Sequence, residues 1–354
     1  MSGLSQKVTI GDRIVGKDEK AYVIAELSGN HGGSLDKALE LLRAGASTGA
    51  DAIKLQVYRP DTITLNVSHG DFAIPEDNAW SKYKNLYHLY EYAHTPWEWL
   101  PDLFAEAERL GVELFGSVFD DTSVDELEKF PVKAYKIASP EIVDLGLLKK
   151  VANTGKPVIV STGLASLSDI ALAVDCLTEH GCSEVILLKC TTAYPTPPEE
   201  VNLKTVQSLE QTFNCPVGLS DHTVGIGVSI AAVTMGACVV EKHIKLDDGE
   251  ETVDSFFSLT IDEFKTMITE IRRAEVAIGK VEYSLTPEAA KNSNGRRSLY
   301  VSQPIKKGES ITKANIRSVR PGYGLEPKYL PLVLGRKAKH DLIAGDRLSW
   351  DVIA

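Results

Sequence analysis

Two histidines, each at the end of a short apolar segment, are the residues whose type and position most clearly suggest chemistry. His222 lies in the stretch GLSDHT and His243 in the later stretch CVVEKH. Polar groups at the end of a buried strand are costly unless something pairs with them. Neutral imidazoles are common ligands of divalent metal ions. If the two segments are neighbouring strands, we expect both imidazoles to bind one metal ion and to leave coordination positions open, as a Lewis acid requires.

Lysine and serine side chains end or follow several other apolar segments in the same way. They are Lys54, Ser117, Lys136, Ser139, Ser161 and Ser220. Ammonium and hydroxyl groups of this kind hold phosphate or carboxylate. For any one lysine alone, a surface charge is the competing interpretation, but Lys54 and Lys136 lie inside apolar runs, which favours function. Glu26 ends the first segment and is a candidate for handling a proton or a water.

The elements that must position these side chains form a regular alternation. Eight short segments rich in Val and Ile are separated by segments of helical periodicity, and the last helix has a capping-box pair at Thr260 and Glu263. This pattern predicts a (β/α)8 barrel, in which active sites lie at the carboxyl ends of the strands. A doubly wound open sheet is the alternative, but the Gly-rich turn typical of that fold does not follow the first segment. The segments are 21–27, 51–58, 112–119, 133–139, 157–163, 184–191, 215–223 and 238–244.

Two parts of the chain do not fit the repeat. Residues 58–96 form a long insertion rich in aromatic residues, which we expect to be ordered and to serve packing more than ligand contact. The end of the chain carries short β-like pieces with turns at glycine. We therefore expect a barrel domain over 1–280, a linker over 281–295 and a small β-rich domain over 296–354.

Composition and charge narrow the class of protein. The net charge of −11 argues against a nucleic-acid surface or a surface for anionic membranes. Five cysteines in irregular spacing indicate reduced thiols in a cytoplasmic protein. The first residues have no apolar core of a secretory signal, and no segment has the length of a membrane span.

The motifs, taken in order, resemble the sialic acid synthase family, whose members condense phosphoenolpyruvate with an N-acetylated hexose. The tail resembles the antifreeze-like (SAF) domain of that family. Within the family, the segment 27–34 and the Thr-Pro-Trp-Glu-Trp signature at 95–99 resemble the pseudaminic acid branch rather than the sialic and legionaminic branches. Lys189 stands where sialic acid synthases tend to have a histidine. The motifs are IAELSGNHGGS, GADAIKLQ, AYKIAS, STG, CTTAYPTP, GLSDHT, EKH, VDSFFS and SVRPGYGL.

The resemblance implies roles for individual residues. It implies metal binding by His222 and His243, with Mn2+ as the expected ion and Mg2+ or Co2+ as alternatives. It also implies a domain-swapped homodimer, in which Arg320 of one subunit lies over the barrel mouth of the other. The implied roles of the remaining residues are phosphoenolpyruvate binding by Lys54, Ser117, Lys136, Ser139, Ser161 and Ser220, catalysis or water handling by Glu26 and Glu141, and sugar binding by Asn30, Gln56, Tyr194, Asp254 and Arg320.

The reaction that the resemblance implies is the condensation of phosphoenolpyruvate with 2,4-diacetamido-2,4,6-trideoxy-altropyranose and water, with release of phosphate. A sialic or legionaminic acid synthase is the alternative with a different sugar. A Schiff-base aldolase using Lys189 is an alternative with different chemistry, and borohydride would trap it covalently. A barrel whose tail binds carbohydrate is the non-enzymatic alternative, which predicts no phosphate release.

Overall fold

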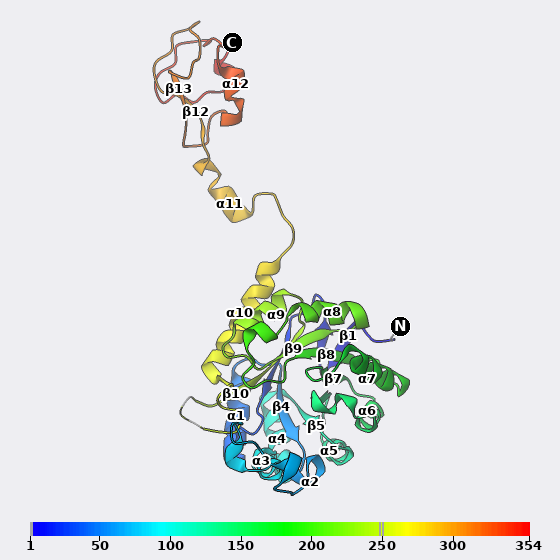
Figure 1. Ribbon diagram of the computed structural model, residues 1–354. Coiled ribbons are helices and arrows are strands. Elements are labelled where there is room, and N and C mark those ends of the chain that lie inside the picture. The colour runs from blue at the N-terminus through cyan, green and yellow to red at the C-terminus, as the bar shows by residue number, and fades with distance from the viewer. Residues whose placement is uncertain (1–2, 248, 250) are drawn as a thin grey trace. The chain divides into compact units, whose positions relative to one another are not determined.

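The computed structural model describes residues 3–247, 249 and 251–354, and it divides the chain into two compact units. The first unit is Met1–Gly279 and the second is Lys280–Ala354. Figure 1 shows the helices of the first unit arranged around its strands. Each unit is described by itself below.

The first unit is a closed barrel of parallel strands, which confirms the predicted fold. Each strand pairs in parallel with the next one along the chain, and the last strand also pairs with the first, which closes the sheet. All eight predicted segments form strands. They are β3 (Tyr22–Glu26), β4 (Ala52–Val57), β5 (Glu113–Val118), β6 (Tyr135–Ile137), β7 (Val158–Ser161), β8 (Val185–Cys190), β9 (Val217–Asp221) and β10 (Val239–Lys245).

Helices connect the strands and bury one face against them. The first begins where the Ser34 side chain accepts a hydrogen bond from the backbone N–H of Lys37, and the last begins with the predicted capping box of Thr260 and Glu263. Buried aliphatic side chains from the outer face of the strands and from the helices form one continuous core. The helices are α1 (Leu35–Ser47), α4 (Leu100–Leu110), α5 (Asp121–Leu127), α6 (Leu145–Ala152), α7 (Leu167–Glu179), α8 (Lys204–Phe213), α9 (Gly227–Thr234) and α10 (Ile261–Ile278), with a short strand β11 (Leu259–Thr260) beside β10.

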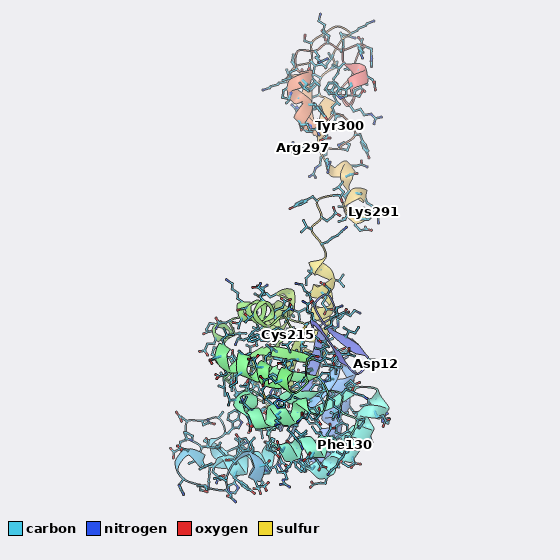
Figure 2. All side chains as sticks on the ribbon, turned by 90° about the vertical axis from the view of Figure 1, so that its right-hand side faces the viewer. Asp12, Phe130, Cys215, Lys291, Arg297 and Tyr300 are labelled. Carbon is cyan, nitrogen blue, oxygen red and sulfur yellow. The ribbon has the colours of Figure 1, made fainter. Side chains whose placement is uncertain are left out.

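A hairpin that the sequence analysis did not predict packs at the amino ends of the barrel strands. It consists of β1 (Lys7–Ile10) and β2 (Arg13–Gly16), and its turn carries Asp12. Figure 2 shows Asp12 and Cys215, which precedes β9, near this end of the first unit. The hairpin places Val8, Ile10 and Val15 in a buried apolar cluster with inward-facing residues of the strands. The inward-facing side chains at this end of the barrel therefore form a mainly apolar core.

The insertion after β4 is ordered, as expected. It contains α2 (Pro60–Ile63) and α3 (Leu86–Ala93), and Leu89 and Ala93 form a small core with Val253. Trp80 donates a hydrogen bond from its indole N–H to the carbonyl of Val253 at 2.9 Å. The insertion is thereby fixed to the loop that follows β10. Short 3-10 helices lie at η1 (Gly70–Phe72), η2 (Ser81–Tyr83), η3 (Trp97–Trp99), η4 (Pro140–Val143) and η5 (Pro198–Glu200).

The second unit begins with a short helix, α11 (Pro287–Lys291), and then forms a small core of its own. Lys291, Arg297 and Tyr300 mark its first part in Figure 2. Its sheet is smaller than the sequence suggests, because the final segment RLSWDVIA contributes single β-bridges rather than a strand. The remaining elements are η6 (Ser293–Gly295), β12 (Ser298–Val301), β13 (Ile316–Val319), η7 (Pro327–Tyr329), α12 (Leu330–Val333) and η8 (Trp350–Val352). In the described part of the chain, no helix is long and apolar enough to cross a membrane.

Candidate active site

The inward-facing residues of the barrel change from apolar to polar along each strand. Every second residue of a strand faces the same side. Ile24 is therefore followed by Glu26 on β3, and Phe115 by Ser117 on β5. At the carboxyl ends these polar side chains surround a cavity of about 340 Å³. Its polar lining consists of Lys54, Gln56, Ser117, Lys136, Ser139, Glu141, Ser161, Tyr194, Ser220, His222, Glu241 and His243.

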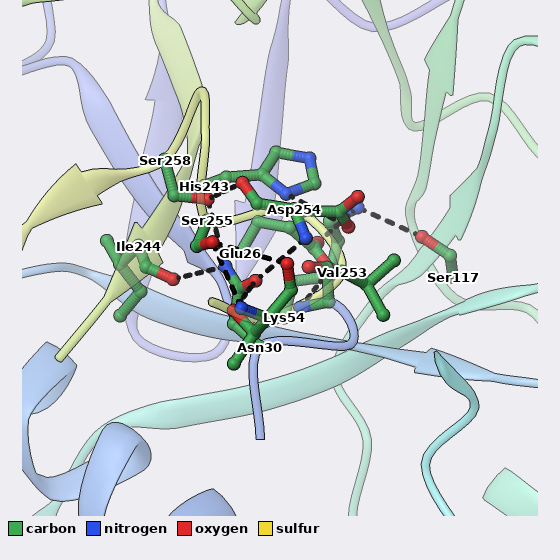
Figure 3. A network of polar contacts seen from close by, with 12 residues as sticks. Glu26, Asn30, Lys54, Ser117, His243, Ile244, Val253, Asp254, Ser255 and Ser258 are labelled. Atoms are coloured by element: carbon green, nitrogen blue, oxygen red, sulfur yellow. Dashed lines mark hydrogen bonds and ion pairs between the residues drawn. The ribbon is translucent and has the colours of Figure 1, made fainter. Parts of the chain in front are cut away.

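Two buried lysines lie at the bottom of this cavity and share a carboxylate. Lys54 Nζ is 2.6 Å from Glu26 Oε2 and 3.4 Å from Glu241 Oε1, and it donates to Ser117 Oγ at 3.0 Å. Lys136 Nζ is 3.3 Å from the same Glu241 oxygen. Figure 3 shows Lys54 between Glu26 and Ser117. Because buried charges are tolerated only when they are paired, this network explains how two ammonium groups stay inside the barrel.

The two carboxylates of the network are not equivalent. Burial raises the pKa of Glu26, and the nearby Lys54 does not fully offset this effect. Burial acts on Glu241 in the same direction, but Lys136 and Lys54, with a hydrogen bond from Ser220, bring its pKa down to about 2. One firmly ionised carboxylate therefore lies between two lysines, and this end of the cavity is suited to receive an anion.

The two imidazoles lie at the same end of the cavity. The ring centroids of His222 and His243 are 5.3 Å apart. Nδ1 of His222 is 3.1 Å from the carbonyl oxygen of Thr191, which favours a proton on Nδ1 and makes Nε2 the nitrogen that a metal ion would take. Burial and the neighbouring His222 hold the pKa of His243 well below its ordinary value, so this ring is neutral.

This pair of imidazoles fits a metal ion with open coordination positions. Nδ1 of His243 is buried and has no hydrogen-bond partner among the described residues, and Asp254 Oδ2 is 3.8 Å from it. Within residues 3–247, 249 and 251–354, no group of three or more His, Cys, Asp or Glu side chains is arranged to hold a metal. The chain thus offers two imidazoles as nitrogen donors at this site. The ring of His243 is neutral, whereas for His222 burial is outweighed by the contacts with Cys190 and the backbone of Thr191, which raise its pKa.

Glu141 and an aromatic wall complete the cavity. Glu141 lies on η4 after β6, and burial raises its pKa to about 7. Its Oε2 is buried without a hydrogen-bond partner in the described part of the chain. A carboxyl group that titrates near neutral pH is suited to take or give a proton. Tyr194 packs on His222 with ring centroids 4.6 Å apart.

Within the first unit, three of the predicted site residues do not line the cavity, namely Glu26, Asn30 and Asp254. Glu26 contacts Lys54 instead. Asn30 uses its amide internally, since Nδ2 donates to the carbonyl of Ile244 and to Ser258 Oγ while Oδ1 accepts from Thr252 and Asp254 (Figure 3).

Asp254 is buried beside His243, and its pKa is raised by burial to about 6. Arg320 is exposed and belongs to the second unit.

Lys189 faces away from the imidazoles. Its Nζ donates to the carbonyl of Cys190 at 2.5 Å and to Thr191 Oγ1 at 2.9 Å. It lines a separate surface cavity together with Pro198 and Lys204. This orientation follows from strand periodicity, because the neighbouring Cys190 lines the active-site cavity. A Schiff-base role for Lys189 in this cavity is therefore not supported.

Two features of the site have no assigned role in the sequence analysis. Glu241 lies two residues before His243 on the same face of β10, so strand periodicity alone indicates that it points into the cavity. Asp221 and Lys242 are cross-strand partners on the outer face, and Lys242 Nζ is 2.9 Å from Asp221 Oδ2. Only the register between β9 and β10 reveals this pair.

Comparisons with known proteins match both parts of the chain. Residues 41–283 match the model of the NeuB family, and residues 296–354 match the SAF domain. A pseudaminic acid synthase of Campylobacter jejuni is 46% identical over 94% of this chain and 96% of its own length. A pseudaminic acid synthase of Helicobacter pylori is 41% identical over 94% of this chain and 97% of its own.

A more distant relative and a solved structure extend this similarity. An N,N'-diacetyllegionaminic acid synthase of Legionella pneumophila is 34% identical over 99% of both chains. The crystal structure of the spore coat polysaccharide biosynthesis protein SpsE of Bacillus subtilis is similar, with a TM-score of 0.68, 32% identity, and coverage of 98% of this chain and 99% of that one.

Proposed function

Because the chain belongs to the NeuB family and carries an SAF domain, we propose that it acts as a pseudaminic acid synthase. The reaction joins phosphoenolpyruvate, 2,4-diacetamido-2,4,6-trideoxy-altropyranose and water, and it releases phosphate. The observation that carries the proposal is that one cavity holds both a paired-lysine anion site and two adjacent imidazoles. The higher identity to pseudaminic than to legionaminic acid synthases favours this sugar.

The lysine end of the cavity is our proposed site for phosphoenolpyruvate. Lys54 and Lys136 supply fixed positive charge, and Ser161 presents a buried hydroxyl without a hydrogen-bond partner among the described residues. Ser117, Ser139 and Ser220 complete the set of hydroxyl groups. Bound there, C3 of phosphoenolpyruvate attacks the sugar aldehyde, and one C–C bond forms. Water then adds at C2, and the C–O bond to phosphate breaks.

The remaining residues hold the aldehyde and move protons. His222 and His243 would hold a divalent metal ion, for which Mn2+ is our first choice and Mg2+ or Co2+ the alternatives. Such an ion polarises a carbonyl when it is bound. Glu141 titrates near neutral pH, so it is suited to exchange the proton of the attacking water or of the new hydroxyl. Glu26 sets the position and charge of Lys54.

We also propose a domain-swapped homodimer in which Arg320 reaches the partner's cavity. The composition of the linker supports the dimer. Its residues Val281, Tyr283 and Leu285 are apolar, yet their exposed fractions are 84%, 97% and 51%. Apolar side chains in such a row favour burial against another surface. We place the enzyme in the cytoplasm, where the free thiols of the five described cysteines stay reduced.

Subunit complementation tests the shared site. Glu26→Ala and Arg320→Ala subunits, each inactive alone, are mixed under conditions of subunit exchange. In a mixed dimer one mouth carries both lesions and the other neither, so up to half of its sites should recover activity. No recovery despite demonstrated exchange would mean that Arg320 does not act in the partner's site.

A substrate panel distinguishes the proposed reaction from its alternatives. Phosphate release from phosphoenolpyruvate is measured with the 2,4-diacetamido-2,4,6-trideoxy sugars of altrose and mannose configuration and with N-acetylmannosamine. We expect the altrose sugar to give the highest kcat/KM. A preference for N-acetylmannosamine would indicate a sialic acid synthase, and a preference for the mannose-configured sugar would indicate a legionaminic acid synthase.

A further inference from the structure

One wall of the active-site cavity is formed by aromatic rings and an isoleucine, with two phenol hydroxyls as its polar groups, in contrast to the charged lysine and imidazole side. It consists of Tyr58, Ile63, Tyr90 and Phe119. The rings are in mutual contact, since the ring centroid of Tyr58 lies 5.7 Å from that of Tyr90 and 5.0 Å from that of Phe119, both edge to face. The wall is therefore one continuous surface.

The position of this wall follows from the insertion after β4. Tyr58 directly follows β4, Ile63 ends α2, and Tyr90 lies on α3, so three of the four residues come from the segment that the barrel repeat does not require. Leu89 and Ala93 on the same helix are buried in the small core of the insertion. Tyr90, by contrast, is only partly buried and lines the cavity. The insertion thus serves packing with one face and the cavity with another.

Phosphoenolpyruvate, which carries a phosphate and a carboxylate, does not suit this wall. A phosphate or carboxylate placed there would lose hydration without gaining a paired charge. A methyl group placed there would leave water for an apolar surface, which is favourable. Of the two substrates in the proposed reaction, the sugar carries methyl groups, at C6 and on its acetamido groups.

Building on the proposed function, we propose that Ile63, Tyr90 and Phe119 form the subsite for the C6 methyl group of a 6-deoxy sugar. These residues thereby act as specificity determinants against sugars with a hydroxyl group at C6. An apolar pocket discriminates against an added hydroxyl by about 100-fold at most. We therefore expect kcat/KM for the 6-deoxy sugar to exceed that for its 6-hydroxy counterpart by a factor of about 10 to 100.

The test compares 2,4-diacetamido-2,4,6-trideoxy-altrose with 2,4-diacetamido-2,4-dideoxy-altrose in wild type and two variants. Phe119→Tyr adds a hydroxyl group to the wall, and Ile63→Thr replaces the ethyl group of the side chain by a hydroxyl group, with the loss of one heavy atom. Each should lower the ratio of kcat/KM values by about tenfold and leave the KM for phosphoenolpyruvate unchanged. Leu65→Thr is the matched control, because Leu65 is exposed in the same segment and does not line the cavity.

An unchanged ratio in both variants, with circular dichroism and Tm like those of wild type, would overturn the subsite. A loss of activity towards both sugars by the same factor would also overturn it, because a general defect is not a change of specificity. If wild type releases no phosphate with any of the N-acetylated sugars, the proposed function itself fails. That outcome is distinct, because it appears before any variant is compared.

Discussion

Replacing Lys242 by Met should destabilise the barrel by several kcal/mol, although Lys242 does not line the active-site cavity. Its ammonium group is 2.9 Å from Asp221 Oδ2 and donates to the carbonyl of Thr223 at 2.6 Å. The side chains of Lys242 and Asp221 are 1% and 0% exposed. The variant therefore leaves a carboxylate in the interior, stabilised by Ser229 Oγ and the N–H of Thr223 alone.

The size of the effect follows from these contacts. Removing one partner of a buried ion pair costs about 3–5 kcal/mol, because the remaining charge has no counterion. Asp221→Asn together with Lys242→Met removes both charges and keeps groups that can bond to Ser229 and Thr223. The double variant should therefore recover more than half of the loss, to within about 2 kcal/mol of wild type.

The pair also lies next to the two imidazoles along the strands. Asp221 and Lys242 are directly opposite in the register of β9 and β10, each one residue before a histidine. β9 and β10 also approach closely at Gly218, where a Cβ atom added to this residue would lie 2.5 Å from the carbonyl oxygen of Val239. The single variant should therefore also weaken Mn2+ binding, measured by calorimetry on the folded protein.

Urea unfolding followed by circular dichroism measures the stability change, from the shift in midpoint at constant slope. Lys265→Met is the control, since Lys265 is exposed on α10, and a change within about 0.5 kcal/mol is expected. The reasoning is refuted if Lys242→Met costs less than about 1 kcal/mol, or if the double variant is as unstable as the single one.

Three further predictions concern the site itself. His222→Ala and His243→Ala should each abolish Mn2+ binding in calorimetry and nearly all turnover, whereas His69→Ala, on the surface, should change neither; full activity after exhaustive chelation would contradict this. Lys54→Ala should raise the KM for phosphoenolpyruvate at least tenfold and that for the sugar much less, and the opposite pattern would reassign Lys54. Glu141 has a folded-state pKa of about 7, above its unfolded value, so its contribution to stability is present below about pH 4.5 and is lost as the pH rises through 7. As the pH rises from 5 to 8, the free energy of unfolding of Glu141→Gln should therefore increase by about 3 kcal/mol relative to that of wild type, measured by urea unfolding. A difference in free energy of unfolding that does not change with pH would contradict this.

The barrel was predictable because its strands are separate and strongly patterned. Each apolar segment is followed by a helical one, and only a parallel closed or open sheet satisfies that order. The segment after residue 27 contains Gly29, Gly32 and Gly33 but not the G-x-G-x-x-G spacing of a dinucleotide-binding open sheet, which favoured the closed form. The amino-terminal hairpin was missed, although its two alternating segments flank a Gly-Asp turn at 11–12.

Side-chain partners were less predictable than strand positions. Asn30 has a residue type that suits sugar binding, yet its amide is used to fix the loop around Thr252 and Asp254. Sequence distance hides this contact, because the two segments meet only when β10 pairs with β3. The same holds for Lys242, whose partner Asp221 is set by register rather than by sequence spacing.

The measurement that most directly tests the account is product analysis with purified enzyme. Phosphoenolpyruvate and 2,4-diacetamido-2,4,6-trideoxy-altrose are incubated with Mn2+, and phosphate and sugar acid are quantified by colorimetry and NMR. The account predicts one phosphate released per nine-carbon 2-keto acid formed, loss of both products with EDTA, and recovery on adding Mn2+. Formation of no sugar acid, or full activity after complete removal of divalent metal, would contradict it.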